Sequence, residues 1–130
     1  MPALTQDRPT PEREGRLVSN LLAAAAAIYA GAMYVLDAEG KATAATAAST
    51  KPVRAVALAR ADQAAGDERV DGAVGVFCFD NDAAAPLTIA DIGAAAYVSD
   101  DQTVKKSEGS CKAGVVFDVD ERGVWVRIGA

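Results

Sequence analysis

The residues that could perform acid–base chemistry in this chain are carboxylates and thiols, because the chain contains no histidine. Catalysis near neutral pH most often uses histidine, so Ser/His/Asp and Cys/His triads are excluded. Two carboxylate pairs remain, Asp80 with Asp82 and Asp100 with Asp101. A small hydrolase built on such a pair would need two convergent acids, whereas neighbouring acids in turns usually point into water. We therefore expect no catalytic residues and predict that the protein is not an enzyme.

Metal and cofactor sites are also disfavoured by the residue types. Cys78 and Cys111 lie far apart and form no Cys-x-x-Cys pair, which leaves too few soft ligands for zinc. We expect two free thiols, with a disulfide only if the strands that hold them are neighbours. Asp80-Asn81-Asp82 is similar to the start of a calcium loop but lacks the later glycine and glutamate. No glycine-rich phosphate motif is present, so we expect no metal and no cofactor.

Charge and hydropathy restrict the partners of the chain. It has 130 residues, a net charge of −5 and a pI near 4.6, which argues against nucleic acid as a partner. The sequence shows no signal peptide. The apolar run 21–36 is mostly alanine and stops at Asp37, so no membrane span is expected. Much of the 51% hydrophobic fraction is alanine and only 5% of the chain is aromatic. The core should be thin, and partners should contribute to stability.

Residues 1–16 are expected to form an extended arm. Prolines 2, 9 and 11 disfavour helix for the residues before them, charges alternate, and large apolar side chains are almost absent. Such a segment is either a disordered terminus or an arm that becomes ordered against a partner as an added strand. The residues that could contact that partner are Thr5, Asp7, Arg8, Pro9, Thr10, Pro11, Arg13 and Arg16.

The last quarter of the chain, 113–128, is typical of a β-hairpin. Two alternating runs are joined by Asp120-Glu121-Arg122-Gly123, which has turn residues. Alternation across a strand predicts that one face of each run lines the core, namely Val115, Phe117 and Val119 in the first and Val124, Val126 and Ile128 in the second. The opposite face carries Trp125 and Arg127. Trp125 could pack under a loop of its own chain or belong to a contact surface.

The preceding segments also favour short strands. We predict strands over 28–36, 53–60, 74–79, 94–98 and 104–106, an irregular or edge segment over 42–50, a charged loop over 62–71 and one helical turn at 88–91. Phe77 and Phe79 share one side of their strand, which should be buried on both faces or at an interface. The alanine run 23–27 is compatible with helix or strand. Together these segments predict an all-β domain over 17–130, a small barrel or sandwich of short antiparallel strands.

Several short motifs together resemble a family of small tailed-phage head proteins known as capsid cement or head decoration proteins. The motifs lie at 5–15, 28–31, 91–93 with Tyr97, 100–104 and 119–126. The resemblance implies a β-rich homotrimer on the outer surface of the virion, made in the host cytoplasm, whose arm binds the major capsid protein. It also implies that Phe77, Phe79, Trp125 and Arg127 contact the trimer partner or the capsid. The alternative is a non-viral β module that binds a protein or a glycan.

Overall fold

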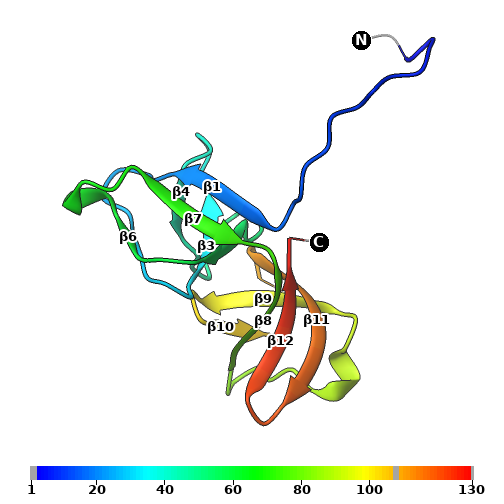
Figure 1. The fold of residues 1–130 in the computed structure, drawn as a ribbon. Helices are drawn as coiled ribbons and strands as arrows, with labels where there is room; N and C mark the ends of the chain where they lie inside the picture. Colours follow the sequence, from blue (N-terminus) through cyan, green and yellow to red (C-terminus); the bar gives the residue numbers. More distant parts are fainter. Residues whose placement is uncertain (1–2, 107–108, 130) are drawn as a thin grey trace.

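The computed structural model describes residues 3–106 and 109–129 and is all-β, as the sequence predicts. Two sheets form the body and an extended arm leaves it at the N-terminus (Figure 1). A five-stranded sheet has the order β1-β7-β5-β3-β4, and a closed barrel has the order β10-β8-β12-β11-β9. The sheet strands are β1 (Leu17–Leu21), β7 (Arg69–Ala73), β5 (Ala55–Ala57), β3 (Met33–Leu36) and β4 (Ala42–Ala44). The barrel strands are β10 (Thr103–Lys105), β8 (Gly75–Asn81), β12 (Gly123–Ile128), β11 (Lys112–Asp120) and β9 (Ala95–Asp100).

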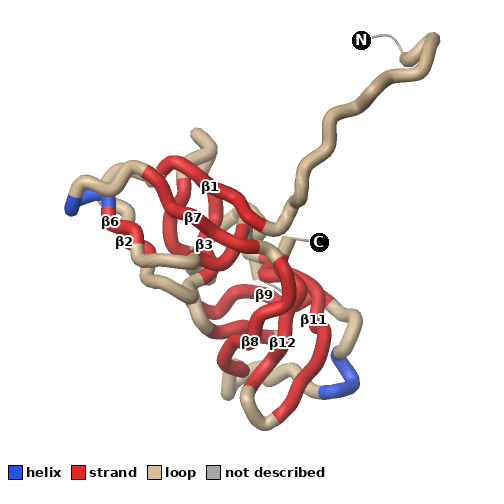
Figure 2. Tube along the Cα trace, in the orientation of Figure 1, coloured by secondary structure: helices blue, strands red, loops and turns tan. Residues whose placement is uncertain are grey.

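The remaining elements are short. β2 (Ala27–Ile28) pairs with β6 (Ala61–Asp62), and two single 3-10 turns are η1 (Gln63–Ala65) and η2 (Ile89–Asp91). Figure 2 shows that strands dominate the body and that no strand extends into the arm. No helix in residues 3–106 and 109–129 has the length and apolar character needed to cross a bilayer.

The five-stranded sheet curls until its two ends almost meet. Just after β1, Leu22 forms a bridge with Ala42 at the start of β4, and the N–H of Ala23 donates to the Ala42 carbonyl at 2.9 Å. Its interior is lined mainly by alanines and filled by the fully buried Tyr34. Small side chains suit so tight a curl, because close packing leaves little space between facing strands. The alanine content therefore has a structural role in this half of the chain.

The barrel carries the larger core and joins it to the sheet. Its interior holds mostly valines and aliphatic residues from all five strands, among them Val98, Val104, Val124 and Val126. Met33, Val35, Val53 and Val56 of the sheet half belong to the same cluster. Backbone hydrogen bonds from Met33 to Asp101 and from Val53 to Lys112, both 2.9 Å, also connect the halves. The two sheets thus share one hydrophobic cluster.

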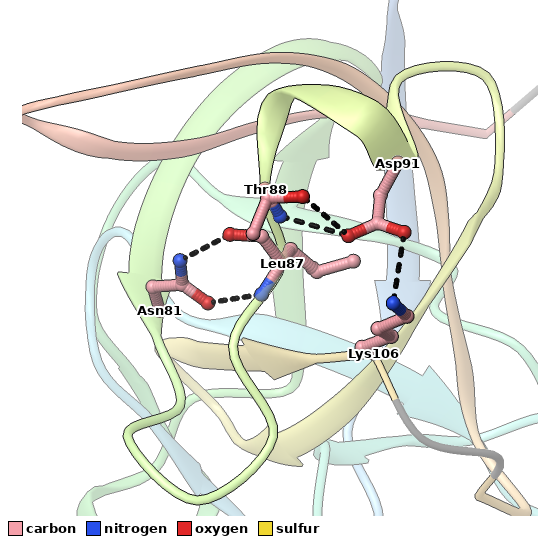
Figure 3. A network of polar contacts seen from close by, with 5 residues as sticks. All are labelled: Asn81, Leu87, Thr88, Asp91 and Lys106. Carbon is pink, nitrogen blue, oxygen red and sulfur yellow. Dashed lines mark hydrogen bonds and ion pairs between the residues drawn. The ribbon is translucent and has the colours of Figure 1, made fainter.

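A loop over 82–94 closes one end of the barrel (Figure 3). The side-chain amide of Asn81 pairs with both backbone groups of Leu87, accepting from its N–H and donating to its carbonyl, each at 2.8 Å. This places the Leu87 side chain in the barrel core, where it is 2% exposed. The Asp91 carboxylate accepts from the N–H of Thr88 at 2.8 Å and forms an ion pair with Lys106 at 3.5 Å. One helical turn results, as predicted.

The terminal hairpin is confirmed, but one of its faces was predicted wrongly. Val124, Val126 and Ile128 are buried as expected. In β11 the inward residue is Val116, 1% exposed, whereas Phe117 is 51% exposed. The register between β11 and β12 shifts between Val116 and Asp118, which marks a β-bulge. An extra residue in one strand reverses the faces of its neighbours, and the sequence alternation does not reveal it.

Three other segments differ from the prediction. The strand expected over 28–36 is two strands, β2 and β3, separated by a turn in which Gly31 has φ 87°. The alanine run 23–27 is neither helix nor strand over most of its length but a turn, with Ala25 at φ 62°. The charged loop expected over 62–71 contains η1 and the start of β7. In contrast, β4 is an edge strand, as one of the two alternatives proposed.

Candidate interaction surface

The arm is the most exposed part of the described chain. Every residue from 3 to 16 is exposed, and Leu4 exposes 72% of its surface. Its hydrogen bonds within the arm are local: the N–H of Thr10 donates to the Arg8 carbonyl at 2.9 Å, and the Arg8 guanidinium donates to the Thr10 hydroxyl at 3.2 Å. The eight residues singled out for partner contact all lie here, with their side chains in solvent: Thr5, Asp7, Arg8, Pro9, Thr10, Pro11, Arg13 and Arg16.

The arm runs directly into β1, which pairs on one side only, with β7. Arg16 and Leu22 bond to the β7 side, through Val74 and Glu68 respectively. Alternation along the strand therefore turns the backbone groups of Leu17 and Ser19 toward the other edge, which is free up to the bridge between Leu22 and Ala42. An unpaired edge of this kind can accept a strand from another chain.

Two exposed leucines lie on β1, and a third lies nearby beside β7. Leu17 and Leu21 of β1 are 57% and 47% exposed, and Leu58, whose N–H donates to the Asp71 carbonyl of β7, is 50% exposed. Arg69 reaches across from β7 and donates to the Ser19 hydroxyl at 2.9 Å and to its carbonyl at 3.2 Å. Part of the edge is thus covered by a side chain that a partner strand would displace.

Trp125 lies on the outer face of the barrel, half-buried beneath its own hairpin turn. Its indole N–H donates to the Asp120 carboxylate at 3.0 Å, and the Arg122 guanidinium lies 5.5 Å from the centre of the ring. Arg127 is exposed on the same face and lies 5.2 Å from the ring centre of Phe117. These contacts fit the first alternative, in which Trp125 packs under a loop of its own chain, whereas its contact with a partner stays a prediction. Sequence reasoning missed Phe117, which it assigned to the core.

Phe77 and Phe79 lie on the inner side of β8, opposite Val126 and Val124 of β12 respectively. Phe79 is 5% exposed in the barrel core, and Phe77, which is partly buried, packs against the same core. The two rings share a face as predicted, and a closed barrel turns this face of the strand inward. Phe79 therefore has little surface left for an intermolecular contact. Contact of Phe77 with a partner stays a prediction.

No family model, curated protein or solved structure matches this chain. Its functional assignment therefore depends on the residues and their geometry.

The thiols and carboxylates occupy structural positions. Cys78 and Cys111 are both free, and burial raises the pKa of each thiol, which keeps them protonated and weakly nucleophilic at neutral pH. The Ser99 hydroxyl donates to Asp82 at 2.6 Å and lowers the pKa of that carboxyl, together with the N–H of Ala84. Asp100 accepts from the N–H of Gln102 in a turn. Among the described residues no group of three or more Cys, Asp or Glu could hold a metal ion.

Proposed function

We propose that this chain is a structural virion protein that binds the outside of a phage capsid and stabilises it by bridging neighbouring major capsid subunits. The observation that carries the proposal is the exposed arm, residues 3–16, which leads directly into the free edge of β1. The resemblance of the sequence motifs to capsid cement proteins supports it. The chain acts as a homotrimer on the outer capsid surface, without catalysis, cofactor, nucleic acid or membrane.

The arm offers a partner both backbone hydrogen-bonding groups and charged side chains. Most of its backbone belongs to no strand, and its prolines reduce the entropy lost when it becomes ordered. Arg8 and Arg13 each offer a planar guanidinium, which can form two parallel hydrogen bonds with a capsid carboxylate. A strand that begins in the arm and continues into β1 would connect the capsid to the body without a flexible joint.

Multivalency makes such modest contacts sufficient. A trimer that holds several capsid subunits at once requires all of its arms to detach before the subunits separate. Each arm can therefore bind weakly while the assembled shell gains much more stability than any single contact supplies.

Deletion of residues 1–16 tests the proposal. The truncated chain should retain its far-ultraviolet circular dichroism and its melting transition, because the arm makes few contacts with the body. It should fail to co-sediment with empty shells of the same phage, whereas the full chain binds them saturably. A Lys41→Gln variant, which removes an exposed cation outside the arm, is the control for lost charge. Retained shell binding by the truncated chain would assign the anchor to the body instead.

A protein- or glycan-binding β module is the second candidate, favoured by two exposed aromatic rings that each lie beside an arginine. Tyr29 is 59% exposed with Arg60 4.9 Å from its ring centre, and Phe117 is 51% exposed beside Arg127. Aromatic and arginine side chains are enriched where partners bind. Binding to a glycan array or a host protein together with no binding to shells would support this alternative.

A further inference from the structure

Two grooves on the surface share Arg54, and lysine and arginine side chains line both of them. The first, about 470 Å³, is lined by Lys51, Arg54 and Lys112 beside the backbone at Gly114 and Gly129. The second, about 540 Å³, is lined by Arg13, Arg54 and Arg69, with the exposed leucines 17 and 58 and one acid, Asp71. We call the five cations the basic band: Arg13, Lys51, Arg54, Arg69 and Lys112.

Backbone contacts fix the arrangement of the band. The N–H of Val53 donates to the Lys112 carbonyl at 2.9 Å, which sets Lys51 and Arg54 beside the start of β11. The N–H of Arg54 donates to the Tyr34 carbonyl at 2.8 Å and so anchors Arg54 to β3. The cations therefore come from the arm, the sheet and the barrel, which the fold brings to one place.

Within the described residues no cation of the basic band forms an ion pair with an acid, although Asp37 lies beside Lys51 and Asp71 lines the second groove. The ion pair found among these residues lies outside the band and joins Lys106 to Asp91 of the loop over 82–94. Within the band, by contrast, the contacts are with neutral oxygens. Lys51 donates to the Asp37 carbonyl at 3.0 Å, and Arg69 to Ser19. Neither Arg54 nor Arg69 forms an ion pair with Asp71, although all three line the same groove. Cations that form no ion pair within the chain favour the binding of a negatively charged group.

We propose that the basic band binds an extended acidic segment of a partner protein. Carboxylates of such a segment would pair with the guanidinium and ammonium groups, while leucines 17 and 58 would contact its apolar side chains. We choose an acidic segment because its charge is complementary to that of the band. The chain as a whole has a net charge of −5, so a nucleic acid whose phosphates continue beyond the grooves would meet repulsion that a short acidic segment within the band avoids. The inference rests on the proposed function only for the partner's identity, which would be the major capsid protein.

Nuclear magnetic resonance titration of the full chain tests this binding. The probe is a short synthetic peptide of alternating glutamate and serine at low salt. Backbone amides at 51, 53 and 54, at 112–114, at 13–19 and at 69–72 should shift. The variant Lys51→Gln/Lys112→Gln should bind the peptide about fivefold more weakly, since two partly exposed charge contacts are lost. The control Lys41→Gln/Lys105→Gln changes the net charge equally but lies outside both grooves, and its affinity should change much less.

The result that overturns the inference is equal weakening in the two double variants, because the peptide would then respond only to net charge. Equal or tighter binding of a single-stranded oligonucleotide with the same number of charges would also overturn it, as would the absence of peptide binding. Added salt should weaken the peptide complex, since the contacts are open to solvent. Because no shell is present in the titration, its failure is distinct from loss of shell binding on deletion of the arm.

Discussion

At the scale of single residues, Tyr34 determines how the curled sheet packs. Its side chain is fully buried, its hydroxyl donates to the Asn20 side chain at 3.0 Å, and burial raises its pKa. Gly72 on β7 lies against it: a Cβ at this position would come within 2.5 Å of the Tyr34 hydroxyl oxygen. The glycine is needed there for space. The sequence identifies Tyr34 as a strand residue, but it does not indicate that a glycine on a distant strand accommodates the ring.

We therefore predict that Gly72→Ala lowers the free energy of unfolding by about 1–3 kcal/mol, because the added methyl group forces the buried ring to move. Urea denaturation measures the loss. Gly15→Ala is the matched control, since a Cβ there meets no atom within 4 Å. In the Tyr34→Phe background, which lacks the closest oxygen, the same alanine should be less destabilising. Equal stability of the Gly72 and Gly15 variants would contradict this account of the packing.

The lowered pKa values of two aspartates allow us to predict how the stability of the folded chain changes in acid. The Ser99 hydroxyl and the Thr88 N–H lower the pKa of Asp82 and Asp91 respectively in the folded chain. Their stabilisation is therefore complete above the unfolded-state pKa, about 4, and is lost as the pH falls through the lower folded values. We expect the melting temperature to fall below about pH 4, and to fall less steeply in Asp82→Asn/Asp91→Asn. Parallel melting curves for the two proteins across this range would show that neither carboxylate contributes.

At the scale of elements, the loop over 82–94 depends on one amide. Asn81 satisfies both backbone groups of Leu87 (Figure 3). Asn81→Ala leaves that donor and that acceptor without their partner, and we expect a loss of about 1–3 kcal/mol in unfolding free energy. Hydrogen exchange should accelerate in 82–94 before the barrel strands open. Gln102→Ala, which removes an exposed amide, is the control. Unchanged exchange in the loop would show that its other contacts, such as those of Asp91 and the hydrogen bond from Gly93 to Val116, hold it without Asn81.

The strands of the terminal hairpin show where the sequence pattern is enough to predict which side chains are buried. In β12, valines and isoleucine alternate without interruption, so Val124, Val126 and Ile128 were correctly placed in the core. In β11 the same signal failed at Phe117, because a bulge adds one residue and the pattern still alternates through it. The alanine run gave no signal, since alanine is compatible with helix, strand or turn. Its turn depends on contacts with distant segments, such as the hydrogen bond from Ala25 to Gln63.

At the scale of the whole molecule, the arm could be predicted from the sequence but the basic band could not. Proline spacing and alternating charge suffice to indicate an extended segment, because both act locally. Arg13, Arg54 and Lys112, in contrast, belong to three separate segments and meet only through the pairing of strands across the two halves. A net charge of −5 even argues against such a concentration of positive charge.

The outer face of the terminal hairpin is where we expect the chain to associate with itself. Phe117 is half-exposed, whereas Trp125 is held within its own hairpin by Asp120 and Arg122. Phe117→Ala should therefore leave the melting temperature of the isolated chain nearly unchanged but weaken trimer formation by about 2 kcal/mol, as measured by sedimentation equilibrium. Trp125→Ala should mainly lower the melting temperature, because it removes half-buried area and a hydrogen bond. If Phe117→Ala sediments as the unaltered chain does while binding to shells is weakened, this face contacts the capsid and the trimer interface lies elsewhere.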